Sequence, residues 1–298
     1  MSFERLRITK PIDYGSVVIS VDGNNHHSQQ PSLASDTTHS QNSYVSFYSY
    51  PAYIDDEDYD DYEPEKDYKT LFKEHCVATP FIILAVSLFV LPTVYWHSFQ
   101  WDSLCMGLAG WTAARLLIKP VDWLFSTLLR RQLSTNSLFL NVTFGILEES
   151  IRLELILLNF AETDFLFAYW LGLGWASAEA ICYIIRHFKE IRLYKEDVDT
   201  DFKARDAIED TLGKPLNTLS AWWGVMWTLS TTMLNIGLSC WIYSSSTLVY
   251  AAAILHATLY VIWANCLPSW GIPTTSYRML ITSMAVFLVG LALLGVIE

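Results

Sequence analysis

The chain is predicted to fold as an all-α bundle of about seven membrane-spanning helices that follows a disordered, acidic N-terminal tail. Hydrophobic residues make up 52% of its 298 residues and aromatic residues 14%, a balance that favours a polytopic membrane protein over a soluble domain. The hydrophobic residues gather into seven runs between residue 77 and the C-terminus. The acidic residues gather before these runs, with nine of them in residues 55–67.

We expect residues 1–75 to form a disordered cytosolic tail and residues 76–298 to form the integral membrane domain. The tail is rich in Ser, Gln, Asn, Tyr and Asp and has no sustained apolar period, which is typical of disorder. Residues 1–15 lack the apolar core of a cleavable signal peptide, so the first span is expected to target the chain. The net charge of −12 comes largely from the tail and speaks against nucleic acid as a partner.

Each of the seven runs has the length and composition of one helical span, so the lipid bilayer is the first partner that the sequence predicts. The predicted spans are Val77–Tyr95, Ser103–Ile118, Ser137–Phe160, Phe165–Ile185, Leu219–Tyr243, Leu248–Cys266 and Met279–Ile297. Lys and Arg residues between the spans lie in residues 119–131 and 186–214 and at Arg278, whereas the loops on the other side have none. This distribution predicts a cytosolic N-terminus and a lumenal C-terminus, and the span lengths favour the endoplasmic reticulum or the nuclear envelope.

The cysteines give no sign of a disulfide framework or of a zinc site. They are scattered through or beside the apolar runs, and no two of them have CxxC spacing. The five cysteines are Cys76, Cys105, Cys182, Cys240 and Cys266. Small buried hydrophobic residues are the simpler interpretation, and neither a metal nor a cofactor is predicted.

The third predicted span, Ser137–Phe160, carries ionisable residues near its centre. Glu148, Glu149 and Arg152 interrupt a stretch that is otherwise almost wholly apolar. An ionisable side chain at the centre of a bilayer is costly unless it faces a polar cavity or a partner. We therefore expect this cluster to be the seat of function.

In each of four predicted spans, helical periodicity gathers polar residues on one face of the helix, since successive residues of a helix are about 100° apart. These residues are Asn141, Glu148, Glu149 and Arg152 in the third span, Glu179 and Tyr183 in the fourth, Asn235 in the fifth, and His256 and Tyr260 in the sixth. Counted from the lumenal span ends at about 1.5 Å per residue, the four polar faces lie at similar depth. We expect them to meet in one polar layer within the membrane.

Such a layer has the groups that hydrolysis needs. A carboxylate beside a second carboxylate and an arginine, with a histidine across the cavity, can deprotonate a water molecule. The histidine and an amide can stabilise the oxyanion that forms when this water attacks a carbonyl group. The sequence has no HExxH, GxSG or GxGD motif of other intramembrane proteases, which leaves a glutamate-activated water as the protease mechanism.

Three segments resemble motifs of the glutamic-type intramembrane proteases. Glu148–Arg152, EESIR, is similar to the paired-glutamate motif written EExxK or EExxxR. Gly172–Tyr183, GLGWASAEAICY, resembles the Gly-rich helix ending in Glu of the PrsW branch, and Leu255–Trp263, LHATLYVIW, resembles its histidine helix. The segments occur in the family's order and cover roughly residues 80–270. The family consists of multi-pass proteins that cleave membrane-associated substrates, and its relatives include the CAAX-prenyl endopeptidases and the scaffold subunit of gamma-secretase.

The resemblance implies a role for each matching residue. Glu148 or Glu149 would activate the water, and Arg152 would take the basic position, where the PrsW pattern prefers Lys. Glu179 would be the acid of the second motif and His256 the histidine of the third. The position four residues after this histidine, Asn in the CAAX pattern, is Tyr in this chain. The candidates for supporting residues are Asn235, Asn141, Tyr183 and Tyr260.

Two functional classes follow from these residues. The first is an intramembrane glutamic peptidase that acts on transmembrane or membrane-associated proteins. The second is a non-enzymatic relative that binds transmembrane segments in the same polar layer, as a scaffold or substrate adaptor in a multiprotein quality-control complex. A buried pair of Glu148 and Arg152 that only pins the helices together is the structural alternative. A proton-coupled transporter is disfavoured because no inverted repeat is apparent.

Overall fold

The computed structural model describes residues 66–95, 99–128, 137–159, 165–195 and 202–296, and within them the chain forms helices and short turns but no strand. All of these residues belong to one compact unit of the chain. The helices are α1 (Tyr68–Ser87), η2 (Leu88–Val90), α2 (Leu91–Tyr95), α3 (Trp101–Leu128), α4 (Ser137–Asn159), α5 (Phe165–Ile191), η3 (Arg192–Tyr194), α6 (Phe202–Leu212), η4 (Leu216–Thr218), α7 (Trp222–Ser244), η5 (Ser246–Leu248) and α8 (Val249–Leu293). The predicted all-α class is confirmed for the described residues.

The first helical stretch begins at Tyr68 and ends at Tyr95, and the 3-10 turn η2 separates α1 from α2 within it. Asp67 caps α1, because its side chain accepts a hydrogen bond from the backbone N–H of Thr70 at 3.2 Å. Hydrogen bonds from Thr70 hold the pKa of Asp67 below its ordinary value. Pro92 has no N–H to donate to the carbonyl of Leu88, so the chain tightens into the 3-10 turn η2 between α1 and α2.

The last helical stretch, α8, turns sharply at Gly271. The φ of 75° and ψ of 161° at this residue lie outside the helical region, and glycine adopts a positive φ easily because it has no Cβ. Pro268 and Pro273 flank the turn, and each lacks the N–H that a continuous helix would use. α8 therefore consists of a first arm, residues 249–270, and a second arm, residues 272–293.

Four stretches of the described residues are long and apolar enough to cross a membrane: Tyr68–Val94, Phe165–Tyr194, Ser246–Trp263 and Asn265–Leu293. They overlap the first, fourth, sixth and seventh predicted spans. The second, third and fifth predicted spans coincide with α3, α4 and α7, which are not among the four. Charged residues in the middle of α4, and hydroxyl and amide side chains along α7, lower the mean hydropathy of those helices. The fold is compatible with an integral membrane protein, and the count of seven spans stays a prediction.

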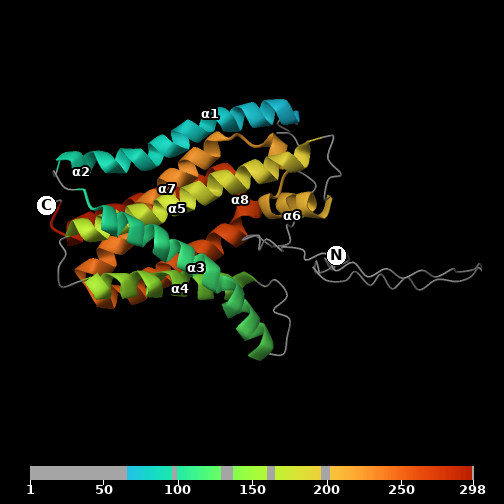
Figure 1. The fold of residues 1–298 in the computed structure, drawn as a ribbon. Coiled ribbons are helices and arrows are strands. Elements are labelled where there is room, and N and C mark those ends of the chain that lie inside the picture. Colours follow the sequence, from blue (N-terminus) through green and yellow to red (C-terminus); the bar gives the residue numbers. More distant parts are fainter. Residues whose placement is uncertain (1–65, 96–98, 129–136, 160–164, 196–201, 297–298) are drawn as a thin grey trace, which may run out of the picture. The chain divides into compact units, whose positions relative to one another are not determined.

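The helix ends gather into two groups. At one end, Leu71 of α1, Ile191 of α5 and Leu216 before α7 form a buried cluster. At the other end, Leu166 at the start of α5 packs with partly buried residues such as Phe287, near the end of α8. Helices α1, α5 and α7 lie side by side (Figure 1). Because the end of α5 meets the starts of α1 and α7, α5 runs opposite to both, as successive passes through a membrane would.

Helix α5 lies at the centre of the bundle. Its apolar segment is 72% buried, against 22–28% for the other three membrane-length stretches. A Cβ on Gly174 of α5 would collide with the α3 backbone at Leu104, and one on Gly107 of α3 would collide with the α5 backbone. A Cβ on Gly172 would lie 2.6 Å from Cα of Ile236 in α7. Small residues thus let α5 approach both neighbours closely.

The start of α1 bears on the predicted division of the chain. Because α1 begins at Tyr68, the last part of the predicted tail, residues 1–75, is helical, and the helical region begins before residue 76. The predicted disorder of residues 1–65 falls outside the described residues.

Candidate functional site

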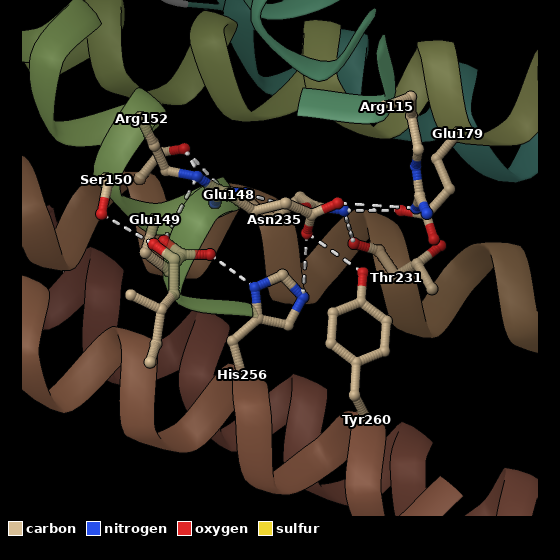
Figure 2. Close-up of polar contacts among 12 residues, drawn as sticks. Arg115, Glu148, Glu149, Ser150, Arg152, Glu179, Thr231, Asn235, His256 and Tyr260 are labelled. Atoms are coloured by element: carbon tan, nitrogen blue, oxygen red, sulfur yellow. Dashed lines mark hydrogen bonds and ion pairs between the residues drawn. The ribbon is translucent and has the colours of Figure 1, made fainter. Parts of the chain in front are cut away.

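Glu148 and Glu149 lie on the side of α4 that faces α8, and Arg152, one turn further along α4, reaches α7. All three are buried, with 1%, 0% and 0% of their surface exposed. Gly145, one turn earlier, allows the two backbones to meet, because a Cβ there would lie only 2.8 Å from the backbone N of Ala257. Since Ala257 follows His256, this contact sets the distance between α4 and the imidazole, which Figure 2 shows pointing toward both carboxylates.

Glu149 joins α4 to α8 through a hydrogen bond with His256. Its Oε1 accepts from Nδ1 of the imidazole at 2.5 Å, while its Oε2 faces Nε of Arg152 at 3.4 Å. The ring of Tyr260 stacks on the imidazole, with centroids 4.7 Å apart. Because a carboxylate oxygen accepts the bond from Nδ1, the imidazole turns Nε2 toward the other carboxylate.

Glu148 is contacted by side chains from two other helices. Tyr260 of α8 donates its hydroxyl to Oε2 at 3.0 Å, and Nε2 of His256 lies 3.5 Å from the same oxygen. Arg115 of α3 brings one terminal guanidinium nitrogen to 3.5 Å from Oε1. This Oε1 is buried and accepts no hydrogen bond from the described residues, so its lone pairs are available to a further donor.

Arg152 extends the cluster to α7 and α5. Its two terminal nitrogens donate to the backbone oxygen and to Oδ1 of Asn235, both at 2.8 Å. The amide nitrogen of Asn235 donates in turn to Oε2 of Glu179 at 3.0 Å. The guanidinium also lies 4.7 Å from the ring centre of Trp175. A continuous chain of polar contacts therefore links α8, α4, α7 and α5 (Figure 2).

The structure joins most of the predicted site residues in this one chain of contacts. They are Glu148, Glu149, Arg152, Glu179, His256, Asn235 and Tyr260. Asn141 is buried on α4, about two turns before Glu148. Tyr183, one turn beyond Glu179 on α5, stacks on His187, with ring centroids 5.1 Å apart.

Ser239 and Arg115 also contact the cluster, although neither is among the predicted site residues. Ser239 accepts a hydrogen bond from Arg152 at 3.3 Å. It lies one turn after Asn235 on α7, and this spacing was a usable signal. Arg115 gave no such signal, because periodicity shows which face of a helix a residue occupies but not which helix lies opposite.

The arrangement of the cluster suits proton transfer. Adjacent carboxylates, an imidazole and a phenol lie within or near hydrogen-bond reach, so Glu148 can take up a proton and His256 can pass one on. Among the described residues, no group of three or more His, Cys, Asp or Glu side chains is placed to hold a metal ion. A small pocket lies elsewhere, where α1 and α5 meet the start of α7.

Comparisons of the chain with models of protein families, with curated proteins and with solved structures find no match. The resemblance of three short motifs to the glutamic intramembrane proteases therefore stays a prediction.

Proposed function

We propose that the chain is an intramembrane peptidase of the glutamic, PrsW-like type, which cleaves membrane-associated proteins with a water molecule activated by Glu148. One observation supports this proposal most: a single imidazole faces two adjacent carboxylates. His256 meets Glu149 through Nδ1 at 2.5 Å and Glu148 through Nε2 at 3.5 Å. This arrangement couples a general base to a group that can return a proton, and an oriented imidazole is common to many hydrolytic sites.

The two carboxylates have different roles in the proposal. Glu149 is held on both sides, by His256 and by Arg152, and acts as a positioning residue that fixes the imidazole. Each carboxylate has one buried oxygen that accepts no hydrogen bond from the described residues. Oε2 of Glu149 faces the fully buried Arg152, whereas Arg115, whose side chain is 19% exposed, faces Oε1 of Glu148. We assign the role of general base to Oε1 of Glu148.

In the proposed reaction, Glu148 removes a proton from water while the water oxygen attacks the carbonyl carbon of a peptide bond. The electrons of the carbonyl double bond move to its oxygen, and the guanidinium of Arg115, 3.5 Å from Glu148, stabilises the resulting oxyanion. The carboxyl group of Glu148 then turns so that its proton faces His256, whose Nε2 lies 3.5 Å from the Oε2 position, and the imidazole passes a proton to the amide nitrogen as the carbon–nitrogen bond breaks. The products are a carboxylic acid and an amine.

The proposed enzyme crosses the membrane seven times, with its N-terminus in the cytosol and its C-terminus in the lumen of the endoplasmic reticulum or the nuclear envelope. The alternating directions of the helices and the division of α8 into two arms support seven crossings. Basic residues such as Lys66, Arg192 and Lys195 lie at the end of the bundle that includes Leu71, which by the positive-inside rule faces the cytosol. Substrates would then be transmembrane or membrane-associated proteins.

Glu148→Gln is expected to reduce cleavage by a factor of about 10²–10⁴, because an amide cannot take up the proton of water. The purified full chain is reconstituted into phosphatidylcholine liposomes together with a detergent-solubilised fraction of membrane proteins. New protein N-termini are then identified by mass spectrometry. Glu154→Gln is the matched control, since Glu154 lies on the same helix but is exposed, and this variant should cleave as the wild-type chain does.

His256→Gln removes the contacts of the imidazole with both carboxylates, and its cleavage is expected to fall as well. The peptidase proposal is wrong if the wild-type chain and Glu148→Gln release the same new N-termini.

One observation favours a second function, that of a scaffold or adaptor for transmembrane segments. Each carboxylate is opposed by an arginine, at 3.5 Å for Glu148 and 3.4 Å for Glu149, so the cluster can hold the helices together without any chemistry. An adaptor would keep its partners in the Glu148→Gln variant, which crosslinking and co-purification from membranes would measure. Neither the wild-type adaptor nor its Glu148→Gln variant would release new protein N-termini.

A further inference from the structure

A second polar pair lies outside the carboxylate cluster, where α1 meets α5. His75 of α1 is 6% exposed, and its Nε2 lies 2.5 Å from Nε2 of His187 in α5. The two histidines are 112 positions apart in the sequence, so no motif spacing reveals the pair. A small pocket adjoins both rings, and its lining includes Thr79, Tyr183 and Ala221.

The other ring nitrogen of each histidine is already engaged. Nδ1 of His75 lies 2.8 Å from the backbone oxygen of Leu71, and Nδ1 of His187 lies 3.3 Å from Oε2 of Glu190. Both partners are acceptors, so each imidazole carries its proton on Nδ1. A neutral imidazole in this form has a bare lone pair on Nε2. Two lone pairs therefore face each other, an arrangement that is repulsive unless a cation lies between them.

We propose that His75 and His187 bind a divalent transition-metal ion, for which Zn²⁺ is a well-suited example. Imidazole nitrogen is a preferred ligand of such ions. Histidines that bind a metal commonly donate their other N–H to a backbone carbonyl or a carboxylate, which are the two partners found here. Among the described residues no third His, Cys, Asp or Glu completes a ligand group, so water would fill the remaining positions from the pocket.

The geometry of the pair has to adjust on binding. Tetrahedral zinc holds two imidazole nitrogens about 3.3 Å apart. One ring therefore rotates outward from the present separation of 2.5 Å. The pocket beside the rings has space for about one water molecule, so the side chains that line it shift with the ring.

A bound ion would fasten α1 to the rest of the bundle. Only 22% of the apolar segment that includes α1 is buried, against 72% for α5, because this helix packs on the bundle along one face. None of the described contacts of the carboxylate cluster involves α1. The metal site is therefore independent of the proposed peptidase, and either proposal can fail without the other.

The test measures Zn²⁺ binding to the full chain, purified without a polyhistidine tag. In the parent for all measurements, the tail histidines His26, His27 and His39 are replaced by Gln, because they would bind metal themselves. Equilibrium dialysis with metal analysis is expected to give one Zn²⁺ per chain. His75→Gln and His187→Gln are each expected to weaken binding at least about 10-fold.

Two further variants distinguish residues that support the metal site from neighbours that do not bind the metal. Glu190→Gln weakens the partner of His187 and is expected to lower affinity about 10-fold. Cys76→Ser is the matched control, because Cys76 is the exposed neighbour of His75 and its loss should change nothing. If His75→Gln does not fold, Co²⁺ added to the parent chain still provides a readout, since ligation by the pair should produce a visible absorption band that excess Zn²⁺ removes.

Two outcomes overturn the proposal. In the first, the histidine variants bind Zn²⁺ as tightly as the parent. In the second, the parent binds neither ion, which would leave a proton shared between the two imidazoles as the link between α1 and α5.

Discussion

Replacing Arg152 with Met is expected to destabilise the folded chain by about 3–5 kcal/mol. The guanidinium is fully buried, lies 3.4 Å from Glu149 and donates to two oxygens of Asn235. Methionine has a similar length but no charge and no donor, so the substitution leaves a buried carboxylate and two buried acceptors with fewer partners. The free energy of unfolding, measured by titrating the detergent-solubilised chain with sodium dodecyl sulfate, tests this expectation.

Two further variants make the measurement specific. Arg278→Met is the control, because Arg278 is exposed and lies over the ring of Trp270 at 3.8 Å, a contact worth about 0.5–1 kcal/mol. Combining Arg152→Met with Glu149→Gln is expected to recover part of the loss, since the uncompensated charge is then gone. A loss below about 1 kcal/mol in Arg152→Met would argue against a buried, ionised Glu149.

Gly145→Val is expected to push α4 away from α8 and to break the hydrogen bond between Glu149 and His256. A Cβ at this position would lie 2.8 Å from N and 2.9 Å from Cα of Ala257, which are backbone atoms that move only with their helix. Overpacking of this kind costs about 1–3 kcal/mol, and more where backbone is displaced. The same titration measures the loss. Ser150→Val, an exposed change on the same helix, should stay within about 0.5 kcal/mol of the wild-type chain.

The role of Gly145 in placing the imidazole can be tested separately. Gly145→Ala is the milder change, and His256→Gln removes the group that the glycine is argued to position. If both act through one contact, their effects on stability and cleavage will not add in a double-mutant cycle. Additive effects would mean that the glycine serves packing alone.

Much of the layout of this chain could be predicted from its sequence. Hydropathy locates apolar runs that coincide with α3, α4, α5 and α7 and with both arms of α8. A helix has a fixed angle and rise per residue, so the face and depth of a polar residue follow from its position within a run. For this reason Glu149, Asn235 and His256, from three separate runs, could be expected in one layer, and contacts in the structure connect them.

Neighbour relations between helices could not be predicted in this way. The face of α3 that carries Arg115 is evident from periodicity, but its packing against Glu148 depends on how whole helices cross. Tyr183 shares a face with Glu179, yet it lies about 6 Å further along α5, where its ring meets His187. The pairing of His187 with a histidine of α1 likewise depends on tertiary packing alone.

The bend at Gly271 has a mechanical consequence for α7. Trp227 of α7 packs on Trp263 of the first arm, with centroids 4.0 Å apart, and Trp241 donates to the backbone oxygen of Val286 in the second arm at 3.1 Å. Helix α7, which carries Asn235, thus packs against both arms of α8, and Gly271 joins these arms directly. A polypeptide inserted between α7 and either arm would have to move that arm away from α7. The backbone change would concentrate at Gly271, about 22 Å along the helix from His256.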